Sequence, residues 1–128
     1  MRKPVHADIA IMAIVGLSLS APFAWGADFA AQARESAARI GRIIGAATTC
    51  VFIPPPRVAA DELKVRDIVA KFASGHPDVT DLQKSYDLGV GEGKTLVPLK
   101  KTNCAFVEND LTNLENLTDL LPSDAAPR

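Results

Sequence analysis

The chain contains two cysteines, Cys50 and Cys104, and this widely separated pair constrains the fold more than any other feature. A disulfide would hold their Cα atoms within about 7 Å of each other. Closing so long a loop would contribute roughly 4 kcal/mol of stability, less any strain in the bridge. A reactive thiol pair is the alternative, but such pairs usually lie close together, as in C-x-x-C. The spacing therefore predicts a structural disulfide.

Residues 1–26 have the three parts of a secretory signal peptide. Arg2 and Lys3 give a positive start, residues 9–21 form an uncharged apolar run, and Ala24 and Gly26 place small residues at a cleavage site. The run is shorter than the roughly 20 residues that span a bilayer. We expect cleavage after Gly26 and no stable membrane span afterwards, with an uncleaved anchor as the alternative. A periplasmic or secreted protein would meet the oxidising conditions in which disulfides persist.

Acidic and basic residues are nearly balanced, with a formal net charge of −1 for the whole chain. Nucleic-acid-binding domains usually carry a clear excess of positive charge. Aromatic residues make up only 5% of the sequence, so platforms for stacking bases are scarce. The overall balance predicts neither a nucleic-acid partner nor a general attraction to anionic membranes.

Apolar residues recur three or four positions apart along the chain after the signal peptide, which is the spacing of amphipathic helices. The first helix is expected over 28–49, with Asp28 as its N-cap. The second should begin between Pro56 and Asp61 and end at Gly75, before Pro77. The first stripe consists of Phe29, Ala33, Ala37, Ile40, Ile44 and Ala47.

A third helix is expected to start between Asp78 and Asp81, with Thr80 or Asp78 as its cap, and to reach Pro98. The fourth should start at Thr102 or Asn103 and stop at Pro122. No stretch shows the alternation of a strand. The sequence therefore predicts an all-α domain over 27–121, followed by a flexible tail over 122–128. Short connectors favour an up-down-up-down four-helix bundle, in which Cys50 and Cys104 lie at one end and close it.

The segment 89–95, GVGEGKT, resembles a phosphate-binding loop, but the first glycine of the required G-x-x-x-x-G-K-[ST] pattern is out of register. An apolar stripe continues through it, which favours a helix. Glycine in a helix costs about 1 kcal/mol relative to alanine, so close helix packing is the expected reason for its presence. The candidates share helical faces at a spacing of four: Gly41 and Gly45, and Gly89 and Gly93. In a square bundle the first and third helices are diagonal, so these faces need not meet.

No catalytic residue, metal site or cofactor is predicted. His76 lies between Gly75 and Pro77 and is interpreted as a solvated residue near a helix end. Transition-metal ligands are few once both cysteines form a disulfide. Carboxylates such as Asp61, Asp87 and Glu92 are expected on solvated faces, with Glu92 near Lys94 and Asp87 near Lys84 as surface pairs.

The signal peptide, the two distant cysteines and the segment 90–93 together resemble small exported bacterial proteins that are mostly helical. The chain also resembles periplasmic acid-stress chaperones, which are small helical proteins with one long-range disulfide, although their characteristic motifs are not found in it. We expect a non-enzymatic exported protein that binds a protein or a small ligand, with no oligomeric state indicated. A stress-induced holdase and a small carboxylate-dependent hydrolase are the alternatives. The candidate ligand-contacting residues, which are more simply read as core, are Val107, Leu111, Leu114 and Leu117.

Overall fold

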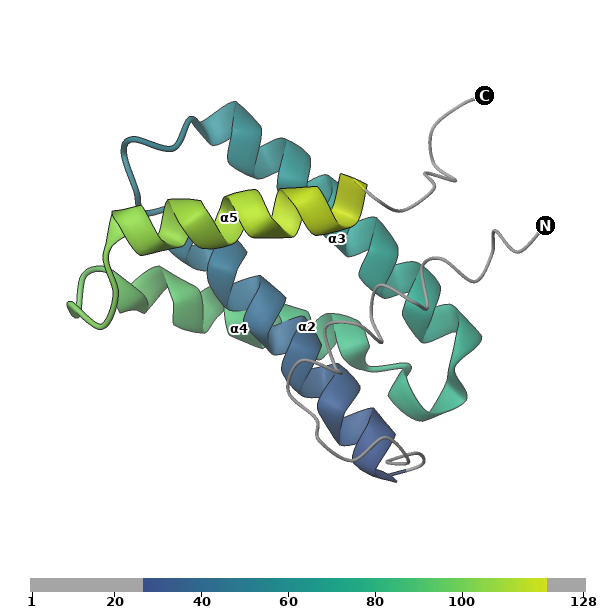
Figure 1. Cartoon of the computed structure of the whole chain (residues 1–128). Coiled ribbons are helices and arrows are strands. Elements are labelled where there is room, and N and C mark those ends of the chain that lie inside the picture. The colour runs from purple at the N-terminus through teal and green to yellow at the C-terminus, as the bar shows by residue number, and fades with distance from the viewer. Residues whose placement is uncertain (1–26, 120–128) are drawn as a thin grey trace.

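The computed structural model describes residues 27–119, and this part of the chain consists of helices joined by loops, with no strand (Figure 1). The predicted all-helical fold is therefore confirmed for these residues. The signal peptide predicted over 1–26 and the tail predicted over 122–128 lie outside them. The elements are α2 (Ala27–Ala47), α3 (Pro55–Gly75), the short 3-10 helix η1 (Pro77–Val79), α4 (Leu82–Leu96) and α5 (Cys104–Asp119).

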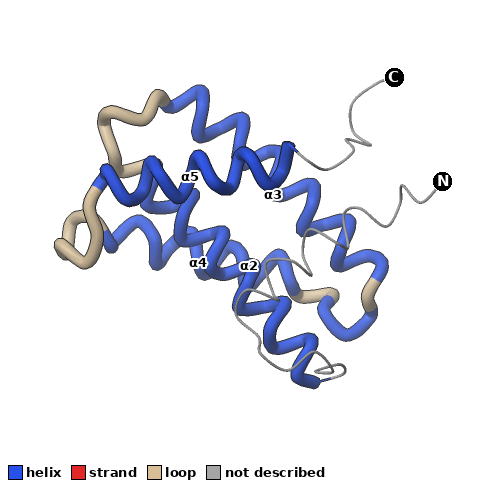
Figure 2. Tube along the Cα trace, in the orientation of Figure 1, coloured by secondary structure: helices blue, strands red, loops and turns tan. Residues whose placement is uncertain are grey.

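Figure 2 shows where each helix gives way to a loop. Prolines, a glycine and an asparagine set several of these ends. Helix α3 begins at Pro55, where the missing N–H costs nothing, and it ends at Gly75. Asn103 caps α5, because its Oδ1 accepts a hydrogen bond from the Phe106 N–H at 3.0 Å. The caps predicted for the third helix were wrong. Pro77 starts the separate turn η1, and α4 begins only after Asp81, which makes no side-chain capping bond.

Helices α2 and α4 are in the closest contact and run in the same direction. Ala38 lies opposite Gly89 and Arg42 lies opposite Gly93, so residue numbers rise together along both helices. Figure 1 shows α2 and α4 crossing. The arrangement thus differs from a square bundle, because the first and third helices meet directly rather than lying diagonally. The up-down-up-down order of all four helices stays a prediction.

The core lies between the apolar faces of all four helices. Its bulkiest fully buried side chains come from each helix and from η1. Aromatic rings close the end of the core near the start of α2, where the Phe72 and His76 rings stack with centroids 4.0 Å apart. His76 Nδ1 lies 2.8 Å from the Phe72 carbonyl oxygen. The principal core residues are Tyr86, Phe72, Ile44, Leu82, Leu111, Val69 and Val79.

Candidate functional site

The four predicted glycines come together in one seam between α2 and α4. A Cβ atom built on Gly41 would overlap the Tyr86 carbonyl oxygen, and one on Gly45 would overlap that of Val90. On the α4 side of the seam, Gly89 and Gly93 face backbone carbonyls of α2. Glycine is needed at these positions because no side chain fits between the two backbones. The geometry also suits weak Cα–H···O contacts between the helices. Gly91, by contrast, has no atom near its virtual Cβ.

Ion pairs across the helix surfaces differ from those expected. Glu92 pairs with Arg42 of α2 at 3.0 Å rather than with Lys94. Asp87 pairs with Arg66 of α3 at 3.0 Å rather than with Lys84. Both expected pairs were based on neighbours in the sequence, whereas packing brings a longer arginine from another helix within reach. Exposed pairs of this kind each contribute little, typically 0–1 kcal/mol.

The disulfide between Cys50 and Cys104 is present, with a Cα–Cα distance of 5.7 Å. This confirms the predicted pairing. Cys50 lies in the connection after α2, and Cys104 is the first residue of α5. The bridge therefore joins the α2–α3 connection to the start of α5 at one end of the molecule, which we call the disulfide end. Such a bond is consistent with an oxidising, extracytoplasmic location.

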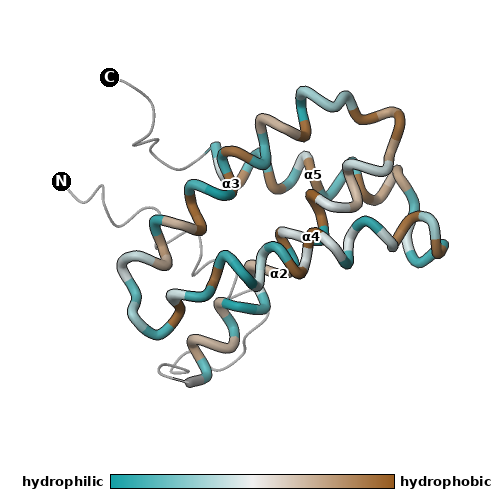
Figure 3. The backbone as a smooth tube through the Cα atoms, turned by 180° about the vertical axis from the view of Figure 1, so that it is seen from behind, coloured by the Kyte–Doolittle hydropathy of each residue, from teal (hydrophilic) through white to brown (hydrophobic). Residues whose placement is uncertain are grey.

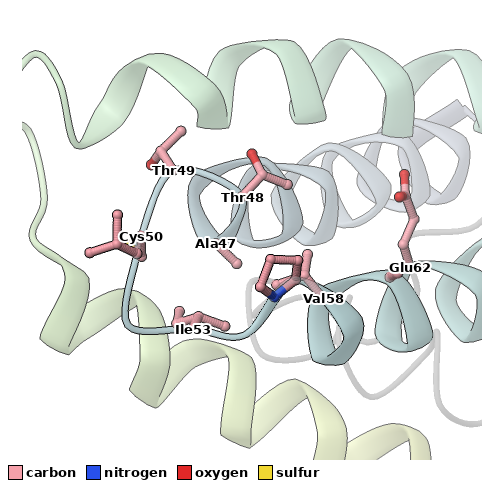
Figure 4. Close-up of a pocket in the computed structure, with 10 residues that line it drawn as sticks. Ala47, Thr48, Thr49, Cys50, Ile53, Val58 and Glu62 are labelled. Carbon is pink, nitrogen blue, oxygen red and sulfur yellow. The ribbon is translucent and has the colours of Figure 1, made fainter.

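A cavity of about 450 Å³ opens beside the disulfide, between the end of α2 and the start of α3. Figure 4 shows Thr48, Val58 and Glu62 around this space. Its volume falls in the range of small-molecule sites. The walls are mostly apolar, with two threonines and one glutamate as the polar groups. The lining residues are Ala47, Thr48, Thr49, Cys50, Val51, Ile53, Pro55, Val58, Ala59 and Glu62.

The polar groups of this cavity present acceptors to a ligand. The Thr48 hydroxyl donates to the Gly45 carbonyl at 2.6 Å. The Thr49 hydroxyl donates to the Ala46 carbonyl at 2.7 Å. Each hydroxyl proton is thereby used within the end of α2, and oxygen lone pairs remain. Because the Glu62 carboxylate also accepts, the cavity favours a ligand that carries an N–H or O–H donor.

A second polar arrangement links α3 to α5 through Asp61, Arg57 and Glu115. Arg57 donates twice to the Glu115 carboxylate, from Nε at 2.8 Å and from Nη2 at 2.9 Å. Asp61 is only 8% exposed, and its carboxyl group lies within hydrogen-bonding reach of Glu115. Asp61 Oδ2 receives no hydrogen bond from the described residues. The expectation that Asp61 lies on a solvated face was therefore wrong.

The two carboxyl groups are driven to opposite protonation states. Burial and the neighbouring Glu115 raise the pKa of Asp61 to about 7. Hydrogen bonds donated by Arg57, and by Asp61, lower the pKa of Glu115 to about 2. Asp61 can thus keep its proton at mildly acidic pH and donate a hydrogen bond to the ionised Glu115 carboxylate. Acid and base partners in enzymes show a similar divergence, but neither residue lines the 450 Å³ cavity.

The other residues considered from the sequence are part of the packed helical framework. His76 is half-buried against Phe72, so the interpretation as a simply solvated residue was wrong. Val107, Leu111 and Leu114 are buried in the core. Val107 also lines a smaller cavity of about 260 Å³. Residues 89–95 lie inside α4 as continuous helix, so they form no phosphate-binding loop.

Large apolar side chains at the disulfide end were missed by the sequence reasoning. Val51 is 88% exposed and Phe52 is 83% exposed. Leu99 and Phe106 are also exposed, in the α4–α5 connection and the first turn of α5. The sequence feature that could have indicated this surface was the uncharged stretch 48–56, which contains Cys50. Helical periodicity gives no prediction for such a stretch.

Within residues 27–119, no group of three or more histidine, cysteine, aspartate or glutamate side chains is arranged to hold a metal ion. None of the helices described there combines the length and the hydropathy needed to cross a bilayer.

Comparisons with known proteins give no relative: no family model, no curated protein and no solved structure matches the chain significantly.

Proposed function

We propose that this chain is an exported, non-enzymatic helical protein that binds a small, largely apolar molecule at its disulfide end. In this proposal residues 1–26 are removed as a signal peptide, and the domain over 27–121 works in the periplasm or outside the cell. The cavity of about 450 Å³ beside the disulfide is the observation that carries the proposal. Its ligand needs an apolar body with a hydroxyl or amine donor directed at Thr48, Thr49 or Glu62.

The rest of the architecture favours this cavity over other parts of the molecule. The α2–α4 seam has no space for even a methyl group, so a ligand does not enter there. The disulfide holds Cys50, which lines the cavity, against α5. A cavity wall fixed by a covalent bond loses less entropy when a ligand binds than a mobile wall would.

The two alternative functions make different demands on the fold. A hydrolase needs its carboxylates beside a cavity, whereas Asp61 and Glu115 lie within a helix–helix contact. A holdase needs apolar surface that becomes exposed as the pH falls. An increase in apolar dye binding towards pH 2 with the disulfide intact would favour the holdase over a ligand carrier.

A fluorescent probe with the right chemistry tests the proposal. N-phenyl-1-naphthylamine is neutral and apolar, carries one N–H donor, and brightens in apolar surroundings. We expect saturable binding to the folded protein. Ala59 lines the cavity on the exposed side of α3, so Ala59→Phe should weaken probe binding about tenfold, or 1.4 kcal/mol.

Ala60→Phe is the matched control, because Ala60 is the next residue on α3, is also exposed, and does not line the cavity. Both variants should unfold at nearly the same temperature. The proposal is wrong if the probe does not bind, or if the two variants bind it equally well while both remain folded.

A further inference from the structure

The exposed apolar side chains gather on two connections at the disulfide end. Val51 and Phe52 follow α2, while Leu99 lies between α4 and α5. Figure 2 shows these two loops at the same end of the molecule, and Figure 3 shows hydrophobic residues in both. The Cys50–Cys104 bond holds the loops near one another. We call the surface formed by residues 51–52, 99–101 and 106 the disulfide tip.

Two lysines without an acidic partner in the described part of the chain accompany this apolar surface, although Glu108 and Asp110 follow Phe106 along α5. No aspartate or glutamate occurs in 43–60 or in 93–107, whereas Lys94, Lys100 and Lys101 all occur in the second stretch. Lys100 and Lys101 are exposed, and among residues 27–119 neither forms an ion pair. The near balance of charge over the whole chain therefore hides a local excess of positive charge at the disulfide tip.

Backbone hydrogen bonds fix the α4–α5 connection, which carries part of the tip. The Lys100 N–H donates to the Val97 carbonyl at 2.9 Å, and the Lys101 N–H donates to the Leu96 carbonyl at 2.8 Å. Lys100 has φ of 60°, in the left-handed region where glycine is usual. A lysine there costs about 1 kcal/mol more than a glycine. Its presence at a position that favours glycine is in keeping with a use for its charge.

We propose that the disulfide tip docks on the surface of a bilayer that contains anionic phospholipids. Phe52, Leu99 and Phe106 would enter the boundary between headgroups and acyl chains, and the lysines would meet lipid phosphates. Apolar side chains flanked by basic ones are the usual composition of a surface that lies in this boundary. Each lysine near an anionic leaflet contributes a factor of about five in binding.

The shape of the tip favours a bilayer over a flat protein partner. The α4–α5 connection projects beyond the ends of the helices in Figure 1, and Val51 and Phe52 project from the other loop. Projecting loops bury their side chains readily in a soft medium. Val51 also lines the cavity, but Phe52, Leu99 and the two lysines do not, so the docking proposal can be tested separately from ligand binding.

Co-sedimentation with vesicles tests the docking. The protein is isolated from the envelope of expressing cells, with its N-terminus read by mass spectrometry. One set of vesicles is phosphatidylcholine alone, and the other contains about one-third phosphatidylglycerol. We expect binding to the anionic vesicles that weakens with added salt, and at least about tenfold weaker binding to neutral vesicles.

Variants locate the docking surface. Phe52→Ser with Leu99→Ser should weaken binding to anionic vesicles about tenfold or more. Lys100→Gln with Lys101→Gln should weaken it by a similar factor and remove most of the salt dependence. Leu63→Ser with Leu88→Ser is the control, because both leucines are exposed and lie away from the tip. This control should bind like the unaltered chain.

Three results would overturn the proposal. One is equal binding to neutral and anionic vesicles. Another is binding that the tip variants do not change, which would locate it elsewhere in the chain. The third is absence of binding to the anionic vesicles. If the protein is then a dimer in solution that Phe52→Ser with Leu99→Ser converts to a monomer, the tip is an interface between copies.

Discussion

Backbone meets backbone along the α2–α4 seam, whereas large apolar side chains reach into solvent at the disulfide end. The seam uses glycine to remove side chains, so two helices approach as closely as their carbonyl oxygens allow. The disulfide end uses a covalent bond, and the loops around it keep Val51 and Phe52 exposed. The difference lies in what each region does with its surface: the seam buries backbone against backbone, and the disulfide end leaves large apolar side chains exposed to solvent.

Adding methyl groups to the seam should have the largest effect on stability. Gly89→Ala with Gly93→Ala places two Cβ atoms against the Ala38 and Arg42 carbonyls, which are backbone atoms and cannot move aside. We expect a loss of about 5 kcal/mol or more in the free energy of unfolding, enough to unfold a domain of this size. Circular dichroism during urea denaturation measures it.

Gly91→Ala is the matched control for the seam, since it lies in the same helix with open space at its Cβ. It should raise the free energy of unfolding by about 0.5–1 kcal/mol, because alanine favours helix. The seam account fails if the double variant and Gly91→Ala have similar stabilities.

Removing the disulfide should have the next largest effect and should act on the other region. Cys50→Ser with Cys104→Ser should lower the free energy of unfolding by about 2–4 kcal/mol, since the unfolded chain regains the freedom of a long loop. Probe binding at the cavity should weaken while the helical content stays the same. An unchanged denaturation midpoint would contradict this, as would two titratable thiols in protein isolated without reductant.

The Asp61–Glu115 contact should give a smaller effect that depends on pH. The pKa of Asp61 is raised to about 7 in the folded protein, above its ordinary value of 3.8. Its contribution is therefore fully present below about pH 3.8 and is lost as the pH rises through about 7. Asp61→Asn mimics the protonated side chain, so we expect the variant to match the unaltered chain at pH 4 and to be more stable than it at pH 8.

Urea denaturation at a series of pH values measures this difference, with Asp67→Asn as the control on the same helix. Glu115 works in the opposite direction, because its pKa is lowered to about 2. Its contribution is present above about pH 4.5 and is lost as the pH falls through about 2. A stability difference between Asp61→Asn and the unaltered chain that stays constant from pH 4 to pH 8 would rule out a protonated Asp61.

Much of the helical framework could be predicted, because prolines and glycines act locally. Pro77 and Gly75 ended one helix as expected, and the stripe through residues 89–95 correctly indicated helix. The disulfide was predictable for a different reason: with two cysteines in the chain, only one pairing exists. Helix contacts over long distances were not predictable: the square-bundle assumption separated the two glycine faces, whereas the structure packs them together.

The candidate sites were harder to predict for the same reason. Asp61 lies on the buried face of α3 between Val58 and Val65, a spacing that was readable, but a carboxylate is usually solvated. Its neighbours Glu115 and Arg57 are brought close by packing, which one sequence does not reveal. The exposure of Val51 and Phe52 was also not predicted, because hydrophobicity alone suggests burial.

The most direct test of the division between seam and disulfide end is a map of amide chemical shifts during titration with N-phenyl-1-naphthylamine. The account predicts shifts that saturate together and lie within residues 47–62, which contain the cavity lining. Amides of residues 38–45 and 86–93, along the seam, should not move. Saturating shifts along the seam, or none at residues 47–62, would contradict the account.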